Sequence, residues 1–473
     1  MTLPRFWAFL AVALPTLAAL LASLSSVDLT YQLRAGAEIL AARAIPQVDT
    51  WTFTAAGLPW FDQQWGAQVL LASTYDVAGW TGLAVLRAAL VAAIFASVFL
   101  VARQAGLANR TASWLTLGAF AIAAPALALR PQLFGMTLFA LVLLALSQRQ
   151  AHPRVSWVIP LLVLLWANLH GSFFLGPLAV GLTWLADVQR GIQRPHRLLP
   201  VALLSIVAAC ITPFGPAVWS YAVGLSTDPD VTRRITEWQR TSVTSAAGLL
   251  FHASVLGVVV LLVRRRPAVG WPMLLWLAVF AGIGAYAVRG IAWWPLAAVP
   301  VVAELTASGW PHGIERPGTR GMQRLNAILA GALLLAGTAL LPIWRPIDPR
   351  TGTPQGLLTD APPGVTANLR EVARPGDRLF NPQSWGSWVE FAVPRIKVAV
   401  DSRIELFPAT VWADYDDVIT GRGDWSGVLD RWGVTVVVVG AGVDGDAFAK
   451  RLSATGWRQK YVGEDGWVFR ATK

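Results

Sequence analysis

The sequence predicts a polytopic α-helical membrane protein of about eleven spans, followed by a small extracytoplasmic α/β domain. Three observations lead to this fold class. Apolar residues make up 55% of the 473 residues and charged residues only 14%, and the mean hydropathy of +0.52 lies far above soluble usage. Apolar runs of span length recur through residues 1–344 and cease after them. The remainder, 345–473, alternates short apolar runs with helical patterns.

Each predicted span approaches the roughly 20 residues that a helix needs to cross the hydrocarbon core. The fifth and sixth runs are short, and a bent hairpin is the alternative for that pair. Only Arg5 precedes the first run and no small-residue cleavage site follows it, so we interpret it as a retained anchor. The runs lie at 6–26, 81–102, 111–129, 132–148, 155–169, 172–187, 198–215, 247–263, 268–287, 291–306 and 325–343.

Arginine distribution predicts which ends of the spans are cytoplasmic. If the N-terminus is inside, the inner segments hold fourteen arginines and the longer outer segments hold seven, as the positive-inside rule requires. An odd number of spans then places residues 345–473 outside, in an inner-membrane protein with many passes. The net charge of +11 belongs entirely to residues 1–344, because 345–473 balance 16 basic with 16 acidic residues. This distribution excludes a nucleic-acid-binding role, and the single cysteine, Cys210, excludes an intramolecular disulfide.

The first outer loop, residues 27–79, is the most informative segment. It carries five of the eleven acidic residues of 1–344 and is far longer than a connector requires. Polar residues from five outer segments gather at this predicted face, and ionisable groups near a membrane usually mark a site. The alternative is that each one reaches to lipid headgroups by itself. The residues are Asp28, Arg34, Asp62, Arg130, Asn168, His170, Glu237 and Arg289.

The C-terminal domain shows strand patterns at 378–380, 397–401, 435–440 and 467–471, with helical patterns at 425–433 and 446–456. It contains no His, Cys or Gly-rich phosphate loop. Asp401 and Arg403 follow a predicted strand, and three more acids crowd a helix near Asp416. We therefore expect a folded cap whose charges lie on the surface.

Two stretches resemble a large group of bacterial multispanning proteins of the GT-C glycosyltransferase type, which includes protein O-mannosyltransferases and aminoarabinose transferases. The first is DLTYQLRAGAEILAARAIPQVDTWTFTAAGLPWFDQQWGAQVLL at 28–71. The second combines FNPQSWGSWVEF, VDSRIELF and DYDDVITG between 380 and 421. Shorter similarities are LLWANLHGSFFLGP at 164–177, TPFG at 212–215, ITEWQ at 235–239 and VRGIAWWPL at 288–296.

The resemblance implies an inverting transferase that moves a sugar from a polyprenyl-phosphate donor to an acceptor at the outer face of the cytoplasmic membrane. The family's acidic base in the first outer loop corresponds to Asp28, with Asp62 as a second catalytic carboxylate. A positioned carboxylate makes a hydroxyl a better nucleophile, and guanidinium groups suit the leaving phosphate. Arg34, Arg130 and Arg289 are the phosphate-binding candidates. The substrate-binding candidates are Gln32, Gln64, Trp65, Asn168, His170 and Glu237.

The sequence departs from the family pattern at two places. Gln32 stands where the family usually has His, and FDQQW replaces the more acidic second motif, so that Gln63 and Gln64 follow Asp62. Divalent cations prefer several oxygen ligands that include carboxylates. We therefore expect chemistry without a metal; one ion shared by Asp28 and Asp62 is the alternative.

Three other functions remain open on the sequence alone. A transporter of lipid-linked substrates is expected to show internal repeats and ionisable residues near the midplane, and neither pattern is evident here. A polysaccharide ligase or polymerase usually carries its large loop late in the chain. A non-catalytic assembly protein would use the neutral outer domain to bind a partner. The sugar, the acceptor and the length of the lipid are not encoded in any recognisable pattern.

Overall fold

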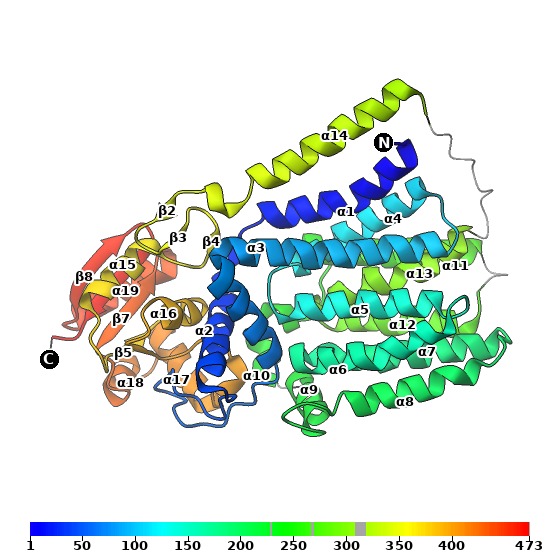
Figure 1. Ribbon diagram of the computed structural model, residues 1–473. Helices are drawn as coiled ribbons and strands as arrows, with labels where there is room; N and C mark the ends of the chain where they lie inside the picture. Colours follow the sequence, from blue (N-terminus) through cyan, green and yellow to red (C-terminus); the bar gives the residue numbers. More distant parts are fainter. Residues whose placement is uncertain (228, 266–268, 308–317, 473) are drawn as a thin grey trace. The chain divides into compact units, whose positions relative to one another are not determined.

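The computed structural model describes residues 1–227, 229–265, 269–307 and 318–472 (Figure 1). The chain divides into two compact units. The helical unit comprises residues 1–22 and 84–341, and the α/β unit comprises 23–83 and 342–473. The outer loop 27–79, which we had assigned to the membrane domain, thus groups with the C-terminal residues. Arg266 and Arg316, two of the predicted inner arginines, and the first residue of the predicted span 268–287 lie outside the described residues.

Each of the eleven predicted spans contains an α-helix, although α4 and α8 end earlier than the spans predicted for them. Among the described residues, six helical segments are long and apolar enough to cross a membrane, and three shorter apolar segments accompany them. The fifth and sixth spans are separate helices, α6 and α7, joined through a 3₁₀ turn at Gly171–Phe174. The helices are α1 (Leu3–Leu21), α3 (Trp65–Gln104), α4 (Asn109–Ala123), α5 (Pro131–Gln148), α6 (Ile159–Leu169), α7 (Leu175–Gln189), α8 (Leu198–Ala208), α11 (Ala246–Arg264), α12 (Trp271–Tyr286), α13 (Trp293–Ala307) and α14 (Arg320–Ala339).

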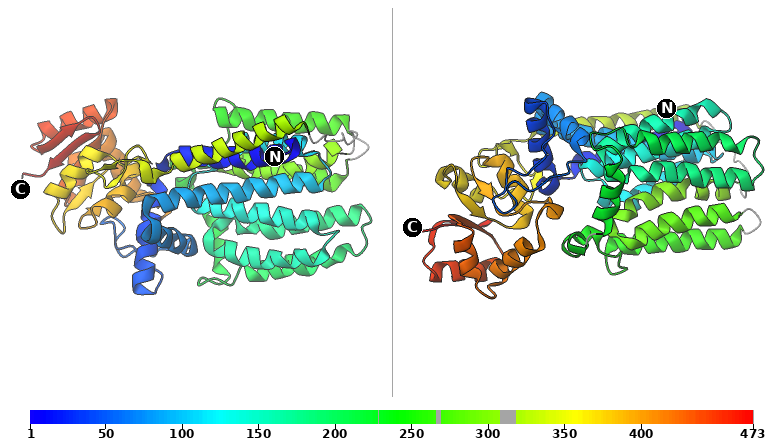
Figure 2. Two further views of the ribbon diagram at one scale, coloured as in Figure 1. Left: turned by 45° about the horizontal axis from the view of Figure 1, so that its top comes forward. Right: turned by 90° about the horizontal axis from the view of Figure 1, so that it is seen from below.

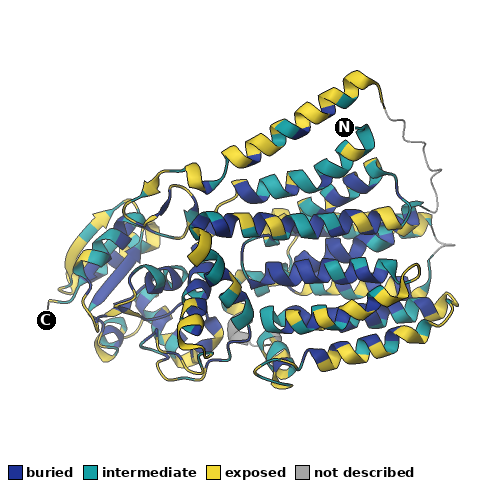
Figure 3. Cartoon of the chain, viewed as in Figure 1, coloured by how far each residue is buried: buried dark blue, intermediate teal, exposed yellow. Residues whose placement is uncertain are grey.

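Helices α5, α6, α7 and α8 run side by side with α12 and α13 (Figures 1 and 2). Aromatic rings fill the centre of this group. Phe139 on α5 lies 5.7 Å from Trp293 on α13 and 5.4 Å from Phe280 on α12, measured between ring centroids. Trp166 on α6 completes the cluster at 6.0 Å from Trp293. The helices α5 and α13 are mostly buried, whereas α14 is largely exposed (Figure 3), as expected for helices that differ in how much lipid they contact.

The longest helix, α3, continues from the α/β unit into the helical unit and is interrupted at Gly79. Gly79 has φ 56° and ψ −151°, a backbone conformation that side chains with a Cβ rarely adopt. The first part of the helix belongs to the outer loop and the second part covers the predicted span 81–102. A glycine is required at this bend because no other residue accepts it without strain.

The C-terminal part of the α/β unit contains a five-stranded sheet of order β6-β5-β7-β9-β8. The strands β5, β6 and β7 are parallel, while β9 pairs antiparallel with β7 and β8. The central strand β7 is apolar along its length and buried (Figure 3), as expected of a strand covered on both faces. The strands are β5 (Arg378–Phe380), β6 (Lys397–Val398), β7 (Val436–Gly440), β8 (Arg458–Gly463) and β9 (Gly466–Arg470).

The sequence predicted β5, β7 and β9, and it predicted a longer β6 than the structure has. It missed β8, whose side chains are mostly polar and exposed. A polar strand at a sheet edge resists pairing with other chains but carries no hydrophobic signal. The helices of this part are α15 (Pro363–Val372), α16 (Gly386–Ala392), α17 (Ala409–Thr420), α18 (Trp425–Arg431) and α19 (Val443–Ala454); α18 and α19 correspond to the two predicted helices.

The outer loop forms part of the same fold through backbone pairing. Strand β1 (Leu24–Ser25) pairs in parallel with β4 (Leu358–Thr359), and Thr52 forms a parallel bridge with Val398. The loop also contributes helix α2 (Ser26–Ala42), which packs on α16. Gly36 allows α2 to approach α3 closely, since a Cβ there would lie 2.1 Å from the carbonyl oxygen of Gln68.

Candidate functional site

Asp28 lies in the first turn of α2 and is half-buried. The helix begins at Ser26, with Ser25 as the N-cap residue, so Asp28 is not an N-cap residue. A carboxylate in the first turn is stabilised by the unsatisfied N–H groups and by the helix dipole. Asp28 thus lies at the N-terminal end of a helix that packs on α16.

Asp62 lies just before α3 and is only 3% exposed. Its Oδ1 accepts a hydrogen bond of 2.6 Å from Gln68 Nε2, while its Oδ2 has no hydrogen-bond partner among the described residues. Burial raises the pKa of Asp62 to about 7, against the opposing effects of the Gln68 hydrogen bond and the Arg403 charge. Asp62 is therefore partly protonated at neutral pH.

Gln32 and Gln64 link α2 to the segment that contains Asp62. Gln32 Nε2 donates to Gln64 Oε1 at 2.8 Å and contacts the Tyr31 hydroxyl oxygen at 2.5 Å. Burial raises the pKa of Tyr31, and the negative charges of Asp28, Glu405 and Asp62 raise it further. Tyr31 thus has three carboxylates near it, two from the outer loop and one from the C-terminal part.

Glu405 is the residue of this group that sequence reasoning missed. It lies in the short 3₁₀ turn Ile404–Leu406, after β6. The signal that could have identified it is the segment VDSRIELF, which we had used only to support the family resemblance. Nothing in the sequence places this segment beside residues 28–62, because more than 340 residues separate them.

We expect the stability of the protein to depend on pH through Asp62. Its folded-state pKa of about 7 lies above the ordinary value, so its protonated form stabilises the fold at low pH and that contribution is lost as pH rises through 7. Asp62→Asn should remove this dependence. At pH 8 the variant should unfold at a higher temperature than wild type, with a free energy of unfolding larger by up to roughly 4 kcal/mol. Thermal unfolding of detergent-purified protein from pH 5 to 8 measures it.

The exposed Asp76 on α3 provides the matched control. Asp76→Asn should keep the pH dependence of wild type. Equal pH profiles for wild type and Asp62→Asn would show that Asp62 titrates as an ordinary surface carboxyl.

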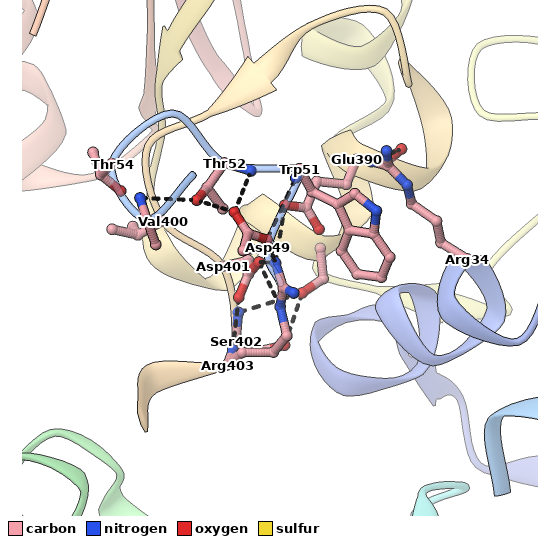
Figure 4. Close-up of polar contacts among 12 residues, drawn as sticks. Arg34, Asp49, Trp51, Thr52, Thr54, Glu390, Val400, Asp401, Ser402 and Arg403 are labelled. Carbon is pink, nitrogen blue, oxygen red and sulfur yellow. Dashed lines mark hydrogen bonds and ion pairs between the residues drawn. The ribbon is translucent and has the colours of Figure 1, made fainter. Parts of the chain in front are cut away.

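A second cluster in the α/β unit is centred on Arg403 (Figure 4). The guanidinium is 1% exposed and donates from Nη2 to Asp49 Oδ1 at 2.8 Å and from Nε to Asp401 Oδ2 at 2.9 Å. It lies 4.4 Å from the ring centroid of Trp51 and 4.5 Å from that of Trp60. The Arg403 side chain therefore joins the C-terminal part to the outer loop at a fully buried position.

Carboxylates surround this arginine on several sides. Asp49 also accepts hydrogen bonds from the backbone and hydroxyl of Thr52, at 3.0 and 2.7 Å. Burial raises the pKa of Glu390 well above its usual range, and the nearby charge of Asp401 raises it further. Burial by itself would lower the pKa of Arg403. The nearby carboxyl groups of Asp401, Glu390 and Asp49 outweigh this effect, so the pKa is raised overall. Burial thus favours the protonated form of the Glu390 carboxyl beside Asp401 and Arg403.

Our expectation that the charges of the C-terminal domain lie on its surface is wrong for Asp401 and Arg403. They are 0% and 1% exposed. The cause is their partner, Asp49, which belongs to the outer loop. Arg34 also takes part in contacts within this unit: it pairs with Glu38 at 3.1 Å, donates to the Glu390 carbonyl at 3.2 Å and stacks 4.6 Å from the Trp51 ring centroid.

The helical unit gathers a separate group of predicted site residues. Arg130, before α5, forms a 2.8 Å ion pair with Glu237. Arg289 stacks over Trp238 at 4.9 Å from its ring centroid, and its carbonyl accepts from Gln132 Nε2 at 3.2 Å. Burial lowers the pKa of His170, and the charges of Arg289 and Arg130 lower it further.

This group has a net positive charge. Burial raises the pKa of Glu237, but the charge and hydrogen bond of Arg130 and the charge of Arg289 outweigh that effect and lower it overall. Among the described residues, the carboxylate of Glu237 faces these two guanidinium groups, and His170 shares a 2.7 Å hydrogen bond with Ser172 Oγ. The group is suited to binding an anion.

The remaining predicted site residues have structural contacts. Asn168, at the end of α6, donates to the carbonyls of Leu164 and Ile211 at 2.9 and 3.0 Å, which joins α6 to the end of α8. Trp65 begins α3 and is half-buried. Within the described ranges, no three His, Cys, Asp or Glu side chains are grouped so that they could hold a metal ion.

Solved structures resemble this chain over nearly its whole length. One is the oligosaccharyltransferase AglB from Archaeoglobus fulgidus, in complex with an inhibitory peptide and a dolichol-phosphate; its TM-score is 0.57 at 12% identity, covering 99% of this chain and 74% of that one. Another is ArnT from Cupriavidus metallidurans bound to undecaprenyl phosphate, with a TM-score of 0.53 at 15% identity, covering 98% and 97%. Both neighbours are GT-C glycosyltransferases. This chain has the GT-C fold.

The GT-C fold confirms the resemblance that the sequence motifs indicated and the polytopic membrane architecture. No protein-family model and no curated protein sequence matches the chain. At identities of 12% to 15% the similarity establishes the fold, and the reaction must be argued from the residues.

Proposed function

We propose that this GT-C chain is a membrane glycosyltransferase that uses a polyprenyl-phosphate sugar as donor. The observation that carries the proposal is the cationic group of Arg130 and Arg289, held with Glu237 and a neutral His170 in the helical unit. Two proteins of the same fold are known in complex with dolichol-phosphate and undecaprenyl phosphate. A guanidinium pair suits a lipid phosphate because each planar group donates two parallel hydrogen bonds to its oxygens.

We assign donor binding to Arg130 and Arg289, with His170 and Glu237 orienting them. Arg34 is better explained as a structural residue, because Glu38, the Glu390 carbonyl and Trp51 already contact its guanidinium. We keep Gln32, Gln64, Trp65 and Asn168 as proposed contacts for the sugar and the acceptor. Their amides and indole donate and accept hydrogen bonds without carrying charge.

In the proposed reaction, the carboxylate of Asp28 takes the proton of an acceptor hydroxyl. The hydroxyl oxygen forms a bond to the anomeric carbon of the sugar while the bond from that carbon to the phosphate oxygen breaks. The lipid phosphate leaves with the electron pair, and Arg130 and Arg289 stabilise its new charge. Attack opposite the leaving group inverts the anomeric configuration.

The role proposed for Asp62 is to limit charge repulsion near Asp28. Its raised pKa keeps it partly protonated at neutral pH, which reduces the negative charge near Tyr31, the residue that Asp28 also faces. We propose that the transfer needs no divalent metal, because Gln32, Gln63 and Gln64 supply amides in the segments where the family pattern is richer in His and acids. Addition of EDTA to the transfer assay should then leave the rate unchanged.

Substitution of Arg289 tests the donor site. Arg289→Lys keeps a cation but loses the planar fork, and Arg289→Ala loses both. We expect Arg289→Lys to weaken donor binding or turnover. Arg289→Ala should reduce donor binding or turnover on the order of 10- to 100-fold, which corresponds to the usual free energy of hydrogen bonds to a charged group. The measurement is transfer and donor binding in detergent with a defined polyprenyl-phosphate sugar.

Arg240 is the control, since it is an exposed arginine in the same predicted outer segment as Glu237. Arg240→Ala should retain wild-type donor affinity. Identical affinity and turnover in wild type and both Arg289 variants would show that Arg289 only anchors the helix end in headgroups.

We propose that the N-terminus is cytoplasmic and that residues 345–473 lie outside the inner membrane. The reason is the excess of arginine at one set of span ends. A reporter active only outside the membrane should give a signal when fused after Lys473 and none when fused after Arg197. The reverse pattern would place the proposed site on the cytoplasmic side.

A further inference from the structure

The helical unit contains a basic pocket that the proposed reaction does not use. Its volume is about 640 Å³, and its lining includes four arginines and one tryptophan: Arg149, Arg154, Arg194, Arg197 and Trp157. The lining residues come from the end of α5, the 3₁₀ turn before α6, the end of α7 and the start of α8. Four segments that are separate in the sequence therefore direct their basic residues to one place.

This pocket lies at the opposite ends of the helices from the proposed donor site. Helix α5 starts after Arg130 and ends before Arg149, and its 18 residues span about 27 Å. Likewise α6 starts after Trp157 and ends before His170. The pocket and the donor site are thus separated by about the thickness of the hydrocarbon core.

The pocket has an excess of positive charge. Arg149 is neutralised by Asp187, which accepts from its Nε at 2.8 Å. Among the described residues, no carboxylate pairs with Arg154, Arg194 or Arg197, all of which are exposed. Three uncompensated guanidinium groups around one cavity attract a compact anion such as a phosphate.

The surface that continues from the pocket is apolar. Trp157 is 51% exposed at the start of α6, and Leu161 and Leu165 follow it on that helix at 55% and 46%. On α8, Leu203 and Leu204 are 63% and 46% exposed. A soluble phosphate compound gains nothing from this surface, whereas acyl chains would bury apolar area against it. Tryptophan at the junction is typical of the level of lipid headgroups.

We propose that this pocket binds the phosphate headgroup of an anionic phospholipid, with the acyl chains along the exposed faces of α6 and α8. Basic pockets between helix ends on the arginine-rich side of a membrane protein are suited to such headgroups. The bound lipid bridges the ends of α5, α6, α7 and α8. The site is independent of the donor-binding arginines and of the proposed transfer.

The test is lipid binding to the full chain in an uncharged detergent, followed by native mass spectrometry. The probes are phosphatidylglycerol and phosphatidylcholine of equal chain length, and inorganic phosphate as a soluble competitor. We expect phosphatidylglycerol to bind in preference to phosphatidylcholine and to resist millimolar phosphate. The triple variant Arg154→Gln, Arg194→Gln, Arg197→Gln should bind phosphatidylglycerol on the order of a hundredfold more weakly, at about fivefold per arginine.

The control removes the same charge elsewhere. Arg264, Arg320 and Arg324 are exposed, belong to the same arginine-rich side and lie outside the pocket. Their triple Gln variant should bind phosphatidylglycerol like wild type. Equal losses in the two triple variants, equal binding of both lipids, or displacement by phosphate would each overturn the proposal. The three single variants, at about fivefold each, test it if the triple variant does not fold.

Discussion

Asp28→Asn is expected to abolish sugar transfer while the protein remains folded and inserted. Asn keeps the size of the side chain and its ability to accept hydrogen bonds in the first turn of α2, but it does not take the proton of an acceptor hydroxyl. General-base catalysis typically contributes 100- to 10,000-fold, so the loss should fall in that range. The assay follows labelled sugar from a polyprenyl-phosphate donor in membrane extracts, where native acceptors are present.

The control for this experiment is Asp76→Asn, which removes an exposed carboxylate of the same loop and should leave transfer intact. Thermal unfolding of the two variants separates a loss of chemistry from a loss of fold. If Asp28→Asn transfers sugar at the wild-type rate, Asp28 acts only through its favourable position at the start of α2. If sugar transfer depends on none of the proposed site residues, the result favours a non-catalytic assembly protein over a transferase.

The second large effect concerns stability. Arg403→Ala leaves Asp49 and Asp401 buried without their cation, and breaking a buried ion pair in this way costs about 3–5 kcal/mol. We expect the α/β unit to unfold at a markedly lower urea concentration, as measured by proteolysis of detergent-purified protein across a urea series. The loss should exceed that of any single surface charge in the same unit.

Arg431 offers the matched comparison, because it also bridges two carboxylates, Asp414 at 3.3 Å and Asp424 at 3.6 Å. Its side chain is 55% exposed, whereas that of Arg403 is 1% exposed. Exposed ion pairs contribute about 0–1 kcal/mol, so Arg431→Ala should shift the midpoint little. Similar midpoints for the two variants would mean that water or local rearrangement compensates the buried aspartates.

The importance of the Arg403 cluster lies in what it positions. Asp49 and Trp51 belong to the same outer loop as Asp62, and the cluster holds this loop on the C-terminal sheet. Arg403→Ala should therefore also reduce transfer, through Asp62 and Gln64, although Arg403 contacts no proposed substrate group. The C-terminal residues thus support the proposed site, whereas we had expected them to form only a folded cap.

The sequence by itself determined the membrane helices and the central strands. A membrane span is determined locally, because a helix of about 20 consecutive apolar residues can cross the hydrocarbon core independently of the rest of the sequence. The buried strand β7 was equally clear, since an apolar run between turn residues has few alternatives in a soluble domain. The acidic outer loop was identified as unusual from its length and charge alone, and the family motifs correctly indicated the GT-C fold.

Only the tertiary structure decided which charges are buried and which carboxylates lie together. Asp401 and Arg403 pair with each other, and nothing near them in the sequence indicates that the pair is buried; the second partner of Arg403, Asp49, is 354 positions away. The same holds for Glu405 beside Tyr31 and for the raised pKa of Asp62. Hydropathy reports the environment that a segment prefers, whereas burial of a charge and its pKa depend on the groups that folding brings within a few ångströms of it.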